Sequence, residues 1–166
     1  MSVNIALLTV TDTRTLENDK SGNILVEKIN KAKHNLVERK ICKDNKEDIK
    51  IILKEWTLKK DLDVIITTGG TGLTGRDITP EALDEIADKH IPGFGEIFRY
   101  FSLETVGTSA IQSRACAVLS NGKYIFALPG SSGGVTDAWD KILVHQLDIN
   151  HRPCNFVELF PRLKEK

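Results

Sequence analysis

The sequence has few cysteines and no excess of either charge. Cys42, Cys116 and Cys154 are widely spaced, with no C-x-x-C pair and no histidine at ligand spacing beside them. We interpret them as reduced thiols rather than as disulfide partners or metal ligands. Lys plus Arg and Asp plus Glu number 23 each, so the net charge is zero. Because no strong field would attract a polyanion, we expect no nucleic-acid partner.

Long apolar runs and low-complexity tracts are also missing. The first apolar run, in "MSVNIALLTVTDTR", has no basic leader and is far shorter than the roughly twenty residues that span a bilayer. We therefore expect no membrane partner and a cytoplasmic location. With 40% apolar and 28% charged residues, the composition is that of a globular protein. A length of 166 residues predicts one domain, residues 1–166.

Strands and helices alternate along the first seventy residues. A continuous apolar run predicts a strand at 3–10 that is buried on both faces. Residues 34–42 predict a less buried strand, and the β-branched residues of 62–68 predict a short third strand. Between them, helical spacing of apolar residues predicts helices at 19–32, with Asp19 or Ser21 as the cap, and at 44–60. This order predicts a right-handed, parallel α/β sheet.

The second half of the chain predicts more helices and one hairpin. Thr79 as N-cap and Pro80 at the first helical position predict a helix start in "TPEALDEIADKH". Asn121-Gly122 between two apolar runs indicates an antiparallel hairpin. Helical stretches are also expected at 93–107, at 108–117 and up to about Leu147. The tail, 148–166, has little periodicity, and we expect it to wrap the surface or a neighbouring subunit.

A glycine-rich loop, "TTGGTGLTGRD", follows the third strand. Gly69, Gly70, Gly72 and Gly75 permit positive φ and close backbone approach, and the hydroxyls of Thr68, Thr71 and Thr74 add donors. Such a loop can bind phosphate, although a plain strand-to-helix connector is nearly as good an interpretation. The sequence fits neither the P-loop pattern nor G-x-G-x-x-G, which argues against a nicotinamide-dependent dehydrogenase.

Acidic residues follow or flank this loop. Asp77 can hold Mg2+ beside phosphate oxygens, or only compensate the dipole of the next helix. Arg76 can steady phosphate or remain solvent-exposed. Asp12 and Asp44 end two other strands, where helix capping is at least as common as catalysis. The four histidines show no partner at useful spacing.

A second loop, "LPGSSGG", repeats these features at another strand end. Pro129 fixes the turn, and Gly130, Ser131 and Ser132 present donors. Two such loops suggest two phosphorylated ligands or one long one. The alternative is a Ser/Gly-rich cap for the last helix.

Several motifs together resemble one family. "TVTDTR", "DKSGNIL", "TTGGTGLTGRDITPEA", "GFGEIFR", "GTSAIQSRA" and "ALPGSSGGV", in this order, resemble the MoaB/MogA family of molybdenum cofactor biosynthesis. The likeness covers almost the whole chain, and "HRPCNF" is similar to the MoaB branch. It implies a three-layer α/β/α fold with a mostly parallel sheet, and homo-oligomers that are trimers or hexamers. The implied activity is Mg-ATP-dependent adenylylation of molybdopterin, which releases pyrophosphate.

The resemblance also implies site residues. Asp77 matches the family's essential aspartate and Asp44 its upstream aspartate, both placed near Mg2+ and the phosphates. Ser132 and Gly133 depart from the P-G-S-P-K-A of many members, which removes a lysine. A non-catalytic molybdopterin-binding or carrier protein is therefore the alternative to the enzyme. The matching nucleotide- and pterin-binding positions are Thr11, Asp12, Ser21, Gly22, Thr68, Gly69, Gly70, Thr71, Gly72, Ser113, Gly130 and Ser131.

Overall fold

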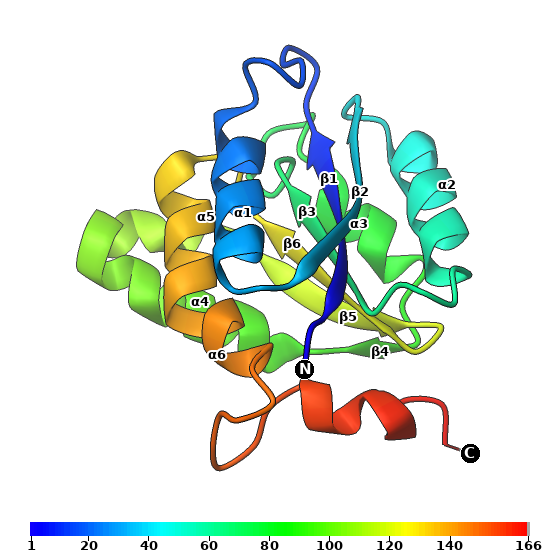
Figure 1. Cartoon of the computed structure of the whole chain (residues 1–166). Coiled ribbons are helices and arrows are strands. Elements are labelled where there is room, and N and C mark those ends of the chain that lie inside the picture. Colours follow the sequence, from blue (N-terminus) through cyan, green and yellow to red (C-terminus); the bar gives the residue numbers. More distant parts are fainter. Residues whose placement is uncertain (166) are drawn as a thin grey trace.

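A six-stranded sheet forms the centre of the molecule, in the order β2-β1-β3-β6-β5-β4 (Figure 1). The computed structural model describes residues 1–165. Strands β1, β2, β3 and β6 run parallel, and β5 and β4 extend the sheet in antiparallel fashion. The strands are β1 (Asn4–Val10), β2 (Asn35–Cys42), β3 (Val64–Thr68), β4 (Lys89–His90), β5 (Cys116–Ser120) and β6 (Lys123–Leu128).

Helices cover both faces of the sheet, which gives the three layers that were predicted (Figure 1). Helices α1 (Lys20–Lys31), α4 (Pro92–Val106) and α5 (Ser132–Ala138) lie on one face. Helices α2 (Lys46–Thr57) and α3 (Thr79–Asp84) lie on the other. The remaining helical segments are η1 (Gly107–Gln112), η2 (Trp139–Leu143), α6 (Val144–Gln146) and η3 (Val157–Arg162).

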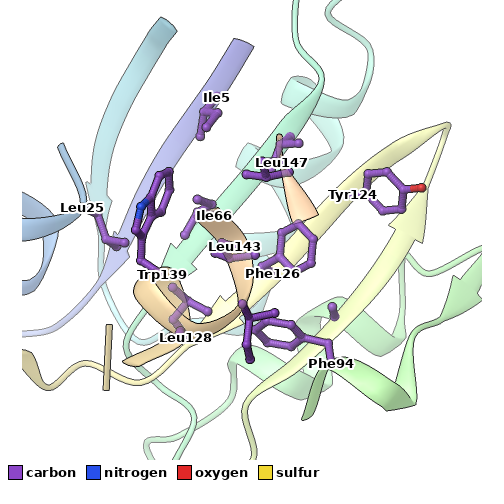
Figure 2. Close-up of a cluster of buried hydrophobic side chains, with 14 of the residues drawn as sticks. Ile5, Leu25, Ile66, Phe94, Tyr124, Phe126, Leu128, Trp139, Leu143 and Leu147 are labelled. Carbon is purple, nitrogen blue, oxygen red and sulfur yellow. The ribbon is translucent and has the colours of Figure 1, made fainter. Parts of the chain in front are cut away.

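Successive residues of the central strands pack into two different cores. Along β1, Ile5 and Leu7 face α1 and α5, whereas Ala6 and Leu8 face α2 and α3. Strand side chains alternate between faces, so a strand buried on both sides must be apolar throughout. Figure 2 shows the first core, where Trp139 and Phe126 are among the fully buried side chains. Both cores hold the strand ends in fixed register.

The predicted hairpin is confirmed, with Asn121 and Gly122 both at positive φ between β5 and β6. The two-residue strand β4 adds an antiparallel pair that the sequence did not indicate. It occupies Lys89–His90, which we had expected to be helical; α3 ends at Asp84. Main-chain hydrogen bonds from Asp88 to Leu119 and from Ile91 to Ala117 draw this segment to the sheet edge instead.

Two further expectations about helices are wrong. Thr79 is not an N-cap: it is the first residue of α3, after the cap position Ile78, and its hydroxyl donates to the Gly69 carbonyl at 2.9 Å. The expected helix at 108–117 is a 3-10 helix that ends at Gln112, and Cys116 already belongs to β5. The first difference matters for the site, because Thr79 ties the glycine loop to α3.

The tail packs on this chain's own sheet. The ring of Phe156 lies 4.6 Å from that of Tyr124 and 5.7 Å from that of Phe126, and Val157 is buried. Figure 1 shows the tail beside the N-terminus, at the end of the molecule opposite the loop that follows β1. Among the described residues, no helix is both long and apolar enough to cross a membrane.

Candidate functional site

A groove of about 1060 Å³ opens where β1, β3 and β6 end. Ligands of open α/β sheets bind at this edge, outside the carboxyl ends of the strands. Its walls come from the loop after β1, the two glycine-rich loops, the end of α4 and the start of α5. The lining residues are Val10, Thr11, Thr13, Arg14, Asp44, Gly69, Gly70, Thr71, Gly72, Asp77, Phe98, Ser102, Thr105, Val106, Ser109, Ala110, Gln112, Ser113, Pro129, Gly130, Ser131, Ser132, Gly133, Gly134, Thr136 and Asp137.

Two glycines of the first loop require their residue type. Gly69 has φ 103°, and a Cβ there would lie 2.2 Å from the carbonyl oxygen of Val10. Gly70 has φ 67°, and a Cβ there would lie 2.4 Å from the hydroxyl of Thr79. No side chain fits such contacts without moving the backbone. Gly72 and Gly75, for which positive φ was also considered, do not adopt it.

Asp77 organises the end of this loop. Its Oδ2 accepts hydrogen bonds from the amide of Thr74 at 2.9 Å and from the Thr74 hydroxyl at 2.7 Å. Burial would raise the pKa of Asp77, but the hydrogen bonds from Thr74 and Gly72 hold it below its ordinary value. The carboxylate thus stays ionised at the groove wall. Its partners belong to the loop, which argues against a role confined to the dipole of α3.

Asp44 is the second carboxylate of the groove, and its surroundings are different. Burial and the nearby charges of Asp12 and Asp77 raise its pKa above the ordinary value. The main chain of Asp12 and the charge of Arg76 oppose this rise, but within residues 1–165 no side chain donates a hydrogen bond to the Asp44 carboxylate. A carboxylate that lies among other carboxylates, without a side-chain donor, is in a place that favours a bound cation.

The donor set fits Mg2+ only if the ligand supplies further oxygens. Within residues 1–165, no three His, Cys, Asp or Glu side chains cluster closely enough to hold a metal ion by themselves. Asp44 and Asp77 are two carboxylates on one groove, and Mg2+ in proteins commonly takes one or two carboxylates, phosphate oxygens and water. The residues present therefore fit Mg2+ together with a phosphorylated ligand.

The second loop, "LPGSSGG", both caps a helix and lines the groove, as the two interpretations of its sequence predict. The hydroxyl of Ser131 accepts from the Gly134 amide at 3.1 Å and caps α5. Gly130 and Ser131 nevertheless line the groove, as do Thr11, Thr71 and Ser113. The loop is fixed to the first one, because the Thr68 hydroxyl donates to the Pro129 carbonyl at 2.8 Å. Capping and groove formation are therefore compatible.

Four residues carried over from the resemblance do not line the groove. Asp12 is ion-paired with Arg76 at 2.6 Å on the exposed rim. Thr68, Ser21 and Gly22 are buried, the last two at the start of α1, where they contact Asp19. These contacts give the four residues structural roles beside the groove, and their roles in ligand binding stay predictions.

Two arginines that the sequence analysis did not single out hold the loops together. Arg14 Nη1 donates to the Ser21 hydroxyl at 3.0 Å and to the Gly130 carbonyl at 3.1 Å. Arg114 donates to the carbonyls of Gly72 and Asp77, each at 2.7 Å, and pairs with Glu81. Arg14 ends the motif "TVTDTR", which follows a predicted strand, and this position is the feature of the sequence that could have pointed to it.

The far wall of the groove was also missed. Phe98, Ser102 and Thr105 on α4, Ala110 and Gln112 on η1, and Asp137 on α5 line it. The sequence predicts the α4 segment only as a helical stretch. Its polar residues carry no local motif, so nothing in the sequence pointed to them.

This fold and this groove are those of α/β proteins that bind ligands at the strand ends. A family model described as "Probable molybdopterin binding domain" matches residues 6–149. Molybdenum cofactor biosynthesis protein B of Escherichia coli is 44% identical over 161 residues, 97% of this chain and 93% of the relative. The protein of that name from Bacillus cereus is 44% identical over 146 residues, 87% of this chain and 86% of the relative.

Solved structures agree. A crystal structure of molybdenum cofactor biosynthesis protein B matches with a TM-score of 0.89 at 40% identity, covering 100% of this chain and 98% of the other. The tungsten cofactor synthesizing protein MoaB from Pyrococcus furiosus matches with a TM-score of 0.76 at 36% identity, covering 86% and 91%. The chain belongs to the molybdopterin-binding domain family of MoaB and MogA, and the predicted resemblance and α/β fold are confirmed.

Proposed function

We propose that this protein acts in molybdenum cofactor biosynthesis and adenylylates molybdopterin with Mg-ATP, releasing pyrophosphate. The observation that carries the proposal is the single groove that joins the Gly69–Gly72 loop, the carboxylates of Asp44 and Asp77, and the Gly130–Ser131 loop. A volume of about 1060 Å³ has room for two ligands. The names of the relatives support the pathway, and the family description supports the pterin ligand.

The proposed reaction asks the protein for position and charge balance. A phosphate oxygen of molybdopterin attacks the α-phosphorus of ATP, a new P–O bond forms, and the bond to pyrophosphate breaks. That oxygen is already ionised at neutral pH, so no general base is needed. Asp44 and Asp77 would hold Mg2+, which offsets charge on the phosphates. The loop amides and the hydroxyls of Thr71 and Ser131 orient the two reactants.

A non-catalytic molybdopterin-binding or carrier protein is the second candidate. The observation in its favour is the second loop, where Ser132 and Gly133 stand at the positions of the proline and lysine of many family members. In addition, Oδ2 of Asp77 already accepts two hydrogen bonds from Thr74, within its own loop. Such a protein would bind the pterin without turnover.

Pyrophosphate release separates the two candidates. Wild type and the variants Asp44→Asn and Asp77→Asn are incubated with ATP, Mg2+ and molybdopterin, and pyrophosphate is measured. We expect turnover by wild type and a loss of at least roughly 100-fold in each variant. Asp48→Asn is the matched control, because this carboxylate is exposed in the first turn of α2 and lies outside the groove. Pterin binding by wild type without any turnover would support the carrier instead.

A further inference from the structure

The groove is lined by three carboxylates and a single cation. Asp44, Asp77 and Asp137 line it, and Arg14 is the one Lys or Arg among its lining residues in 1–165. The proposed ligands are polyanions, and arginine binds phosphate through a planar fork of N–H donors. Arg14 is therefore the one positively charged side chain of this groove lining that can contact a phosphate directly.

Arg14 is fixed in place but keeps donors to spare. Its Nη1 donates to the Ser21 hydroxyl and to the Gly130 carbonyl, and it lies 3.8 Å from Oδ1 of the buried Asp19. All hydrogen bonds of this side chain to residues 1–165 are made by Nη1. The N–H groups of Nε and Nη2 remain for a ligand. The side chain is 36% exposed, so a ligand can reach it.

The support beneath Arg14 is a chain of buried contacts. The Ser21 hydroxyl accepts from Arg14 and donates to Asp19, and Asp19 is itself held by Thr9 and Arg39. Because Asp19 has these other partners, removing the Arg14 guanidinium leaves the core of α1 intact. The loss of Arg14 should therefore change the groove and not the fold.

Gly133 offers an independent place for a positive charge. It lines the same groove, beyond the Gly130 loop that Arg14 contacts. A Cβ at Gly133 would meet no atom within 4 Å, and its φ is not in the left-handed region. A lysine can be placed there without displacing backbone, which makes the charge of the groove testable apart from the hydrogen bonds of Arg14.

We infer that Arg14 is a ligand-binding residue that contacts a phosphate group at the Gly130 end of the groove and supplies the positive charge that Gly133 does not. The inference rests on the proposed function for the identity of its ligands. The phosphate belongs either to the triphosphate of ATP or to the terminal phosphate of molybdopterin. Both sources share the chemistry that the guanidinium recognises.

Binding titrations with three probes test this role. Mg-ATP, molybdopterin and inorganic pyrophosphate are titrated separately into wild type, Arg14→Gln, and Arg14→Gln combined with Gly133→Lys. We expect Arg14→Gln to weaken binding of pyrophosphate and of at least one of the other ligands by roughly 10- to 100-fold. The ligand that weakens identifies the phosphate. Gly133→Lys should recover several-fold of the lost affinity. The lysine restores a positive charge but not the hydrogen bonds of Arg14 to Ser21 and Gly130, so this recovery would show that the charge is what the ligand needs.

Arg162→Gln is the matched control, since Arg162 pairs with Glu165 in the exposed tail and lies outside the groove lining. We expect it to bind like wild type, and thermal unfolding should show that all variants are folded. Unchanged affinities in Arg14→Gln, an equal loss in Arg162→Gln, or a loss that Gly133→Lys leaves uncorrected would each overturn the inference. Pyrophosphate binding that depends on Arg14, without molybdopterin turnover, would refute the proposed function and leave the inference standing.

Discussion

The glycines of the loop after β3 differ in the space that a side chain would find. A Cβ at Gly72 would lie 2.7 Å from Oδ2 of Asp77, whereas a Cβ at Gly75 would meet no atom within 4 Å. Both residues lie outside the left-handed region, so backbone strain does not distinguish them. An alanine at Gly72 should therefore shift the Asp77 carboxylate, whereas an alanine at Gly75 should leave it in place.

We expect Gly72→Ala to lower pyrophosphate release by roughly 10- to 100-fold, because displacing a catalytic group by a fraction of an ångström is costly. Gly75→Ala should retain activity within about two-fold. Steady-state rates and thermal unfolding of both variants check this. Equal rates for the two would mean that the position of Asp77 does not limit the reaction.

The site residues that the sequence made predictable are those in local motifs. Gly69, Gly70 and Asp77 stand in one loop, and glycine density at a strand end is a signal that needs no tertiary information. Arg14 and Arg114 were not predictable, because each binds main-chain carbonyls far along the chain. Arg14 contacts Gly130, 116 residues away, and Arg114 contacts Gly72, 42 residues away. Only folding brings these partners together.

At the scale of elements, the start of α1 depends on one buried carboxylate. Of the two predicted cap candidates, Asp19 is the N-cap, and its Oδ1 accepts from the Gly22 amide at 3.1 Å. Its Oδ2 accepts from the Thr9 hydroxyl at 2.6 Å and from Arg39 at 3.0 Å. Burial would raise the pKa of Asp19, but these hydrogen bonds hold it below its ordinary value of 3.8.

We predict that Asp19→Asn destabilises the fold by about 3 kcal/mol at neutral pH, because Arg39 loses a charged partner while the cap itself remains. A carboxyl whose pKa is lower in the folded state stabilises the protein above its unfolded pKa, and this contribution disappears as pH falls through the folded pKa. The difference between wild type and variant should therefore shrink below about pH 3.8. Urea unfolding across pH measures it; a difference that stays constant into acid would contradict the charge argument.

Element types were more predictable than element ends. The apolar strands and the Asn121-Gly122 hairpin follow from local patterns, and all are present. The segment 85–90 has helical composition, yet it leaves α3 because main-chain groups at Asp88 and Ile91 pair with β5. Pairing with a sheet edge depends on tertiary structure, which local propensity does not contain.

At the scale of the whole molecule, the tail is part of this chain's own fold. Phe156 packs on Tyr124 and Phe126 of β6, and Val157 is buried in the same core, so a version cut after Asn150 would uncover these two rings. Sedimentation of this shortened chain would then reflect its lower stability as well as any change in assembly. The expectation that the tail also contacts a neighbouring subunit stays a prediction, and a surface substitution is a cleaner probe of oligomer state.

Helix α4 presents such a surface. Its buried face carries Phe94, Phe98 and Ser102, while Ile97, Tyr100 and Leu103 on other positions are 48%, 64% and 51% exposed. These three side chains follow one another at intervals of three residues, so they form a stripe of exposed apolar groups along the helix. Exposed apolar groups that gather in this way often mark an interaction surface. The family resemblance implies trimers or hexamers, so we expect this stripe to bind a second copy of the chain.

We predict that wild type sediments as a homo-oligomer and that Leu103→Glu shifts it to monomer, because a charge buried in an apolar interface has no partner. Leu58→Glu is the control, since Leu58 is 74% exposed at the end of α2, on the opposite face of the sheet. Analytical ultracentrifugation of the three proteins checks this, with circular dichroism to establish folding. A monomeric wild type, or a Leu103→Glu variant of unchanged mass, would show that the α4 stripe does not join copies.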